Sequence, residues 1–174
     1  MKRIVRAVGA AVLLAVLPAV TSSGALAASV PMTENLDSLG TAESNEDFSS
    51  GLSAEVHSAE KDGAESFLSV TWSIRNDSGE DVYFDWPTGD SYLYENIPYS
   101  GVTATSADMA TRFHPIMDSS NACLCSGVSS IDFKERIGPG EQVAYWSMFS
   151  VPEDVDAINL EIPGFADVED ITVS

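Results

Sequence analysis

Cys123 and Cys125 are the two cysteines of this 174-residue chain, and a single leucine separates them. On an extended strand, residues two apart point to the same face with Cα atoms about 6.5–7 Å apart, the upper limit for a disulfide. Serine and glycine residues on both sides favour a bent loop that brings the two closer. Three interpretations stay open: a small-ring disulfide, a soft-metal site such as Cu(I) with help from Met117 or His114, and free or intermolecularly paired thiols.

Residues that could catalyse hydrolysis are sparse. A serine or cysteine nucleophile needs a neighbouring base, and the chain has no Gly-x-Ser-x-Gly sequence. His57 and His114 are far apart in the sequence and do not have the spacing of paired zinc ligands. We therefore expect no catalytic residues, no metal ligand set and no cofactor, and we do not expect an enzyme.

Two groups of carboxylates could contribute hard oxygen ligands. Asp85 and Asp90 bracket a Trp-Pro-Thr-Gly turn that could line a sugar or calcium site. Asp167, Glu169 and Asp170 form a second cluster suited to weak calcium binding, although the 12-residue calcium-loop pattern is missing. The alternative explanation for both groups is a turn whose acidic side chains are exposed to solvent.

An aromatic-rich stretch over residues 83–99 is the first candidate for a contact surface. It contains Trp86, Tyr92, Tyr94 and Tyr99. Tyrosine and tryptophan are enriched at protein interfaces because they combine a large apolar area with a polar tip. Core packing is the alternative explanation for about half of them.

The chain is strongly acidic, with 27 Asp and Glu against 8 Lys and Arg and a formal net charge of −19. Such a surface repels nucleic acid and membranes rich in anionic lipids, so we expect neither as a partner. The charge is explained either by solubility, as in a salty habitat, or by a surface that binds cations or a basic partner.

The first 27 residues have the order of a secretory signal peptide. Lys2, Arg3 and Arg6 precede an apolar run over residues 7–20, and Ala25-Leu26-Ala27 forms a small-x-small cleavage site. We predict cleavage between Ala27 and Ala28, a secreted extracellular protein and no stable membrane anchor after cleavage. Residues 28–50 are rich in polar and acidic side chains and predict a disordered or loosely docked arm.

From residue 51 to residue 174 the pattern predicts a β-sandwich of about seven to nine strands. Apolar and polar residues alternate over 52–57, which indicates a strand. They alternate again over 66–86, which indicates two further strands joined by an Asn-Asp-Ser-Gly turn. Shorter signals follow over 91–94, 101–105, 111–116, 131–133, 143–149, 158–162 and 168–173.

The strand over 143–149 is apolar on both faces, which indicates either a central strand or an edge strand under a loop. A single sheet would leave an apolar face in water, so two sheets must pack together. The expected core residues are Leu68, Val70, Trp72, Ile74, Phe84, Trp86, Trp146, Phe149, Leu160 and Ile162.

Four motifs carry a resemblance to a known group. They are the segment from Val70 to Gly79, Cys123-Leu124-Cys125-Ser126, the run from Gly138 to Pro152, and Ile162-Pro163-Gly164-Phe165. Together they resemble uncharacterised secreted actinobacterial proteins that have a small immunoglobulin-like β-sandwich. The resemblance implies that fold and an extracellular location, and it implies no known activity or functional residues.

These observations predict a secreted, non-catalytic β-sandwich domain that binds or interacts at the cell exterior. Its partner would be an unknown extracellular protein or a cell-wall ligand. The alternative is an extracellular soft-metal or redox protein that uses the Cys-Leu-Cys loop.

Overall fold

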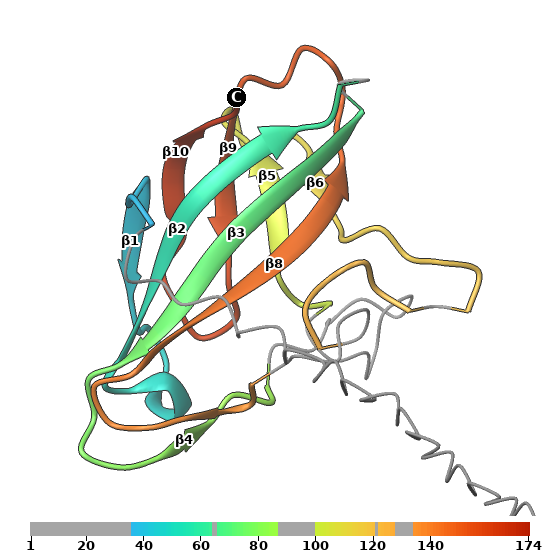
Figure 1. Ribbon diagram of the computed structural model, residues 1–174. Coiled ribbons are helices and arrows are strands. Elements are labelled where there is room, and N and C mark those ends of the chain that lie inside the picture. Colours follow the sequence, from blue (N-terminus) through green and yellow to red (C-terminus); the bar gives the residue numbers. More distant parts are fainter. Residues whose placement is uncertain (1–35, 64–65, 87–99, 121, 128–133) are drawn as a thin grey trace, which may run out of the picture.

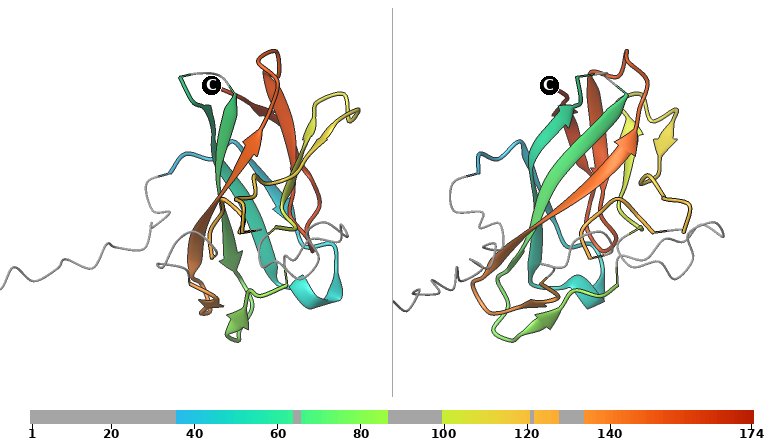
Figure 2. Two further views of the ribbon diagram at one scale, coloured as in Figure 1. Left: turned by 90° about the vertical axis from the view of Figure 1, so that its right-hand side faces the viewer. Right: turned by 45° about the vertical axis from the view of Figure 1, so that its right-hand side comes forward.

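Two four-stranded antiparallel sheets pack face to face and enclose the core (Figures 1 and 2). The computed structural model describes residues 36–63, 66–86, 100–120, 122–127 and 134–174. The first sheet has the order β1 (Gly40–Glu43), β2 (Leu52–Lys61), β3 (Phe67–Asn76) and β8 (Gln142–Ser150). The second has the order β10 (Val168–Thr172), β9 (Ala157–Glu161), β5 (Thr103–Ser106) and β6 (Arg112–Phe113). A small ribbon pairs β4 (Val82–Tyr83) with β7 (Arg136–Ile137).

This arrangement confirms the prediction of an all-β protein. Within the described residues the helical structure is one 3-10 turn, η2 (Asp47–Ser49). The predicted strands over 91–94 and 131–133, the signal peptide and residues 28–35 of the predicted arm lie outside the described residues.

No helix in the described part of the chain has the length and apolar character needed to cross a membrane.

The alternating pattern of β3 places one face of the strand in the core. Leu68, Val70, Trp72 and Ile74 are fully buried, and their neighbours on the strand point away from the second sheet. β3 pairs with β8 from Phe67↔Ser150 to Arg75↔Gln142, so the inward residues of both strands share one face. Most of the predicted core is therefore buried: Leu68, Val70, Trp72, Ile74, Phe84, Phe149, Leu160 and Ile162.

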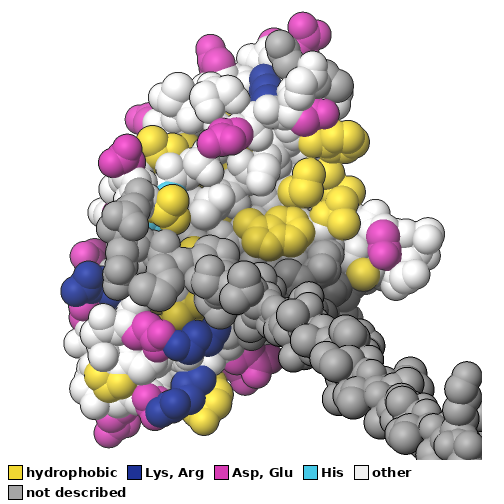
Figure 3. Space-filling view, viewed as in Figure 1, with side chains coloured by type: hydrophobic (Ala, Val, Ile, Leu, Met, Phe, Trp, Pro, Cys, Tyr) yellow, Lys and Arg dark blue, Asp and Glu magenta, His cyan; other side chains and the backbone are white. Residues whose placement is uncertain are grey.

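Two of the predicted core tryptophans are only half-buried. Trp146 pairs with Thr71 across the sheet and shares its outward face, because the inward positions of β8 are taken by Tyr145 and Phe149. Figure 3 shows this outer face, where hydrophobic side chains gather on the right-hand side and acidic ones are scattered around them. The period-two pattern predicted the strand, but apolar residues on both of its faces left the inward set undecided.

The sandwich begins before residue 51. β1 lies within the predicted arm and pairs with β2 in the register Gly40↔Val56. The chain then joins the other sheet, since the Ala166 amide donates to the Glu43 carbonyl at 3.0 Å. A Cβ at Gly40 would lie 2.6 Å from the side chain of Val168, so only glycine permits this approach. Residues 40–49 are thus packed against the two sheets.

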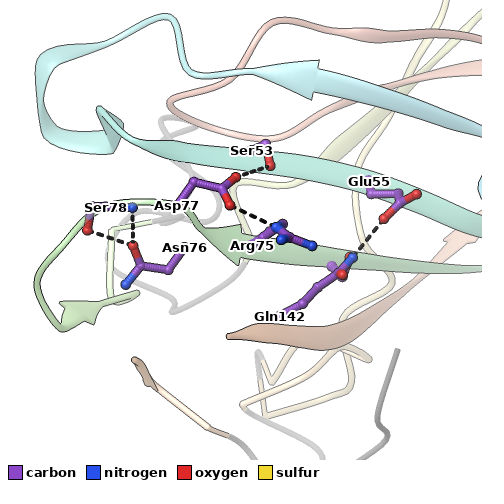
Figure 4. A network of polar contacts seen from close by, with 8 residues as sticks. Ser53, Glu55, Arg75, Asn76, Asp77, Ser78 and Gln142 are labelled. Carbon is purple, nitrogen blue, oxygen red and sulfur yellow. Dashed lines mark hydrogen bonds and ion pairs between the residues drawn. The ribbon is translucent and has the colours of Figure 1, made fainter. Parts of the chain in front are cut away.

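Asn76 joins the end of β3 to the neighbouring turn and to β7. Its side-chain nitrogen donates to the carbonyl of Glu80 at 2.8 Å and of Ile137 at 2.9 Å. Its side-chain oxygen accepts from the amide of Ser78 at 2.9 Å and from the Ser78 hydroxyl at 2.6 Å (Figure 4). Because Asn76 is fully buried and all these bonds are internal, the residue fixes the conformation of the whole connection.

Candidate functional site

A cleft of about 760 Å³ runs along the outer face of the second sheet and ends beside η2. Thr103 and Glu161 are paired across β5 and β9, and they point outward because their strand neighbours Ala104 and Leu160 are buried in the core. We define the cleft by the side chains that carry its chemistry, which are Phe48, Trp86, Arg112, His114, Glu161 and Asp167.

Trp86 is held rigidly in the wall of the cleft. Its indole nitrogen donates to the Pro163 carbonyl at 3.1 Å. Its ring makes edge contacts with Phe84 and Phe48, with ring centroids 4.9 and 5.4 Å away. Phe84 in turn packs on Trp72 in the centre of the core, at 6.0 Å. A chain of aromatic rings therefore links the core to the cleft and sets the orientation of Trp86.

Phe48 reaches the cleft from η2 and is 55% exposed. The position of the Phe48 ring depends on Gly164, which has φ of +91°. A Cβ added to Gly164 would lie 2.7 Å from the Phe48 ring. The Ser49 hydroxyl donates to the Gly164 carbonyl and ties η2 to the same turn. A glycine is required here because both the backbone conformation and the close contact exclude a side chain.

Charged side chains form the floor of the cleft. Arg112 donates to one carboxylate oxygen of Glu161 at 2.8 Å, and the Thr103 hydroxyl donates to the other at 2.8 Å. Asp167 lies in the same cleft, and the pKa of its carboxyl is raised by partial burial and by the charges of Glu161 and Glu169, which Arg112 offsets only in part. Two carboxylates of the cleft thus differ, because Glu161 is paired with a cation and Asp167 is close to other negative charges.

The structure brings one of the predicted contact residues, Trp86, into the cleft. Tyr92, Tyr94 and Tyr99 lie outside the described residues, as does Asp90. Sequence reasoning missed Phe48, Arg112 and Glu161 as cleft residues. For Phe48 a signal existed, because it is an isolated aromatic residue within a polar segment.

The second carboxylate group does not assemble a metal site in the part of the chain that is described. No set of three or more His, Cys, Asp or Glu residues that could hold a metal ion occurs there. Asp167 lines the cleft, whereas the Asp170 amide, at φ of +55°, donates to the side chain of Asn159.

Cys123 and Cys125 are joined as a disulfide, with Cα atoms 5.3 Å apart, and both residues are fully buried. Their loop lies along the free edge of β8. The Ile116 amide donates to the Met148 carbonyl, and the Met148 amide donates to the Leu124 carbonyl. The loop therefore satisfies backbone groups that an edge strand would otherwise expose. Of the two interpretations of this strand, the structure shows the edge strand under a loop.

A serine–histidine pair lies on the outer face of the first sheet. His57 Nε2 is 2.8 Å from the Ser73 hydroxyl, and His57 Nδ1 is 3.0 Å from the Asp37 carbonyl. A carbonyl can only accept, so Nδ1 carries a proton, and in the neutral imidazole the Ser73 hydroxyl donates to Nε2. Gln142 donates to both Ser73 and Glu55, and Figure 4 shows its bond to Glu55. Because Ser73 is fully buried, the pair is inaccessible to a substrate and instead fixes residues 36–39 to β2.

The chain has a structural likeness to a solved protein of unknown function. No protein-family model matches the chain. No curated protein matches it. Among solved structures, the chain is similar to a functionally unknown protein from Listeria monocytogenes EGD-e, with 12% identity and a TM-score of 0.41 over 79% of this chain and 85% of that one.

Proposed function

We propose that this protein is a secreted, non-catalytic binding domain and that the cleft between η2 and the second sheet is its binding site. The observation that carries the proposal is the fixed aromatic wall of the cleft. Trp86 is oriented by contacts within the protein, which are made by the Pro163 carbonyl and two neighbouring rings. Binding sites that are formed in advance lose less conformational entropy on association, which favours affinity.

The walls of the cleft come from segments that are far apart in the chain. Phe48 follows β1, Trp86 follows β4, and Arg112 and Glu161 lie on β6 and β9. Convergent polar groups within a concave, partly aromatic surface are typical of ligand sites. This combination supports binding better than any other described surface of the chain.

The architecture and the location belong to the same proposal. We propose an immunoglobulin-like sandwich in the broad sense of two aligned antiparallel sheets, related to the secreted actinobacterial group that the motifs resemble. We also propose that residues 1–27 are a signal peptide, so that the domain meets an extracellular protein or a cell-wall ligand outside the cell.

The alternative, a soft-metal or redox protein that uses Cys123 and Cys125, has weaker support. A metal ligand or a redox-active thiol must be reachable, and both cysteines are fully buried and bonded to each other. The position of their loop on the edge of β8 supports a structural role instead.

Titration of the full-length, isotope-labelled chain, followed by nuclear magnetic resonance, tests the binding function. The probes are muropeptides, neutral oligosaccharides and short peptides. We expect at least one probe to shift the Trp86 indole signal and to lose affinity in Phe48→Ala. The matched control is Phe67→Ala, an exposed phenylalanine on the first sheet. The proposal is overturned if no probe shifts signals of the cleft, or if all shifts lie elsewhere.

A further inference from the structure

The charges of the cleft are unbalanced. Arg112 is the permanent cation among its described lining residues, and its guanidinium is committed to Glu161 at 2.8 Å. Glu161 also accepts from Thr103, so each oxygen of this carboxylate accepts a hydrogen bond and its charge is offset by Arg112. Glu46 and Asp167 line the same space and bring two further negative charges. The cleft therefore has net negative charge even after its internal ion pair is counted.

Asp167 is the carboxylate on which this excess is concentrated. Partial burial and the nearby charges of Glu161 and Glu169 raise its pKa, although Arg112 acts in the opposite direction. A raised pKa means that the ionised carboxylate is disfavoured in this environment. A cation placed beside Asp167 would relieve that cost, whereas an anion would increase it.

The aromatic part of the cleft suits the same kind of ligand. Phe48 is 55% exposed and stands next to Trp86, which is fixed. Aromatic rings attract ammonium and guanidinium groups through their quadrupole, and they also pack against the methylene stem of such side chains. A cleft that is lined by both aromatic rings and a carboxylate matches a cation on an apolar stem.

We propose that the cleft takes up a lysine or arginine side chain of a basic extracellular peptide, with the stem on Phe48 and Trp86 and the cation beside Asp167. This inference rests on the proposed binding function and specifies the class of ligand. The acidity of the whole chain, with 27 acidic and 8 basic residues, acts in the same direction because it attracts basic partners over a distance.

The experiment compares probes that differ only in charge. The full-length chain is titrated with N-acetyl-lysine methylamide, with its arginine counterpart, and with N-acetyl-norleucine methylamide, which keeps the stem and lacks the cation. The readouts are the Trp86 indole signal and the backbone amides of Asp167 and Arg112. We expect norleucine to bind at least about tenfold more weakly than lysine, since it loses both the carboxylate and the ring attraction.

Variants then test the named contacts. Asp167→Asn should weaken lysine binding by about three- to fivefold, the range for one partly exposed charge pair. The matched control is Glu169→Gln, which removes a neighbouring acid that does not line the cleft and should change affinity less than twofold. Phe48→Leu keeps apolar area, removes the ring and should weaken binding of lysine more than of norleucine.

The outcomes separate this inference from the proposed function. Charge-dependent binding at the cleft that Asp167→Asn weakens supports both. If norleucine or a neutral oligosaccharide binds the cleft as well as lysine does, the inference is wrong and the binding function stands. If lysine shifts are scattered over the acidic surface and are insensitive to Phe48 and Asp167, the inference is wrong as well. If no probe shifts the cleft, both are overturned.

Discussion

The backbone amide of Met148 on β8 donates a hydrogen bond to the carbonyl of Leu124, which lies between the two bridged cysteines, at 3.0 Å. A disulfide that closes so few residues constrains the unfolded chain only a little. The main effect of the bridge is therefore local, because it holds a strand-like segment against the edge of the first sheet.

Replacing both cysteines by alanine should lower the free energy of unfolding by only about 1–2 kcal/mol, as expected for a very small ring. The backbone of the loop would loosen from β8. Hydrogen exchange should then accelerate more for the Met148 amide than for the amide of Trp72, which lies on β3 between β2 and β8 and should follow only the global loss of stability. Equal protection of Met148 in the variant would show that the loop stays docked without the bridge.

Asn76→Ala should be among the most destabilising single changes in the first sheet. It leaves the Ile137 carbonyl and the Ser78 amide without their buried partner, at a cost of about 1–3 kcal/mol. Urea denaturation measures the effect. The control is Asp77→Ala, which removes an exposed ion pair to Arg75 and should change stability little. Similar effects of the two substitutions would contradict the role assigned to Asn76.

Asp167→Asn should stabilise the fold at neutral pH, by less than about 1 kcal/mol because the group is partly exposed. The pKa of Asp167 is raised in the folded state, so the protonated carboxyl stabilises the fold. This stabilisation is complete at pH values below the ordinary pKa of 3.8 and is lost as the pH rises through the folded-state pKa. The gain in free energy of unfolding that Asp167→Asn produces should therefore shrink as the pH is lowered from 7 toward 4.

Urea denaturation at a series of pH values measures this difference. The control is Asp154→Asn, an exposed carboxylate between β8 and β9. An advantage of the Asp167 variant that grows toward low pH would have the wrong sign for a raised pKa.

Gly164→Ala should destabilise the domain by at least about 1–2 kcal/mol, because alanine is strained at positive φ. The new methyl group would also displace the Phe48 ring and change the shape of the cleft. Thermal unfolding and the Trp86 indole signal report the two effects. Gly79→Ala is the control, since its Cβ would meet no atom within 4 Å. An unchanged indole signal in Gly164→Ala would show that the position of the Phe48 ring does not depend on this turn.

Much of the fold could be predicted from local patterns. β3 alternates strictly between large apolar and polar residues, so its inward face was evident before its partners were known. β1 could not be predicted, because only Ala42 of its four residues is buried and a strand with one inward side chain has no measurable period. Its place in the sheet comes from backbone hydrogen bonds to β2, which leave no trace in residue type.

The cleft was predictable only in part. Trp86 stands out as an aromatic residue at the end of a strand pattern. Its partner Phe48 becomes meaningful only when η2 meets the turn at Gly164, which no local pattern encodes. Arg112 and Glu161 are ordinary surface residues in sequence, and the pairing of β5 with both β6 and β9 is what brings them together.

The side chain of Asn45 donates to the carbonyl of Phe165, and the two residues are 120 positions apart. Closing a loop of that length costs chain entropy, so we expect this contact between Asn45 and Phe165 to form late in folding. The β2–β3 hairpin, by contrast, joins neighbours in sequence and can form early. A partly folded chain with the hairpin but without the contact between Asn45 and Phe165 would lack the wall on the Phe48 side of the cleft. The cleft that we propose as the binding site is thus complete only when the two ends of the domain have met, so ligand binding at this cleft would report completed folding.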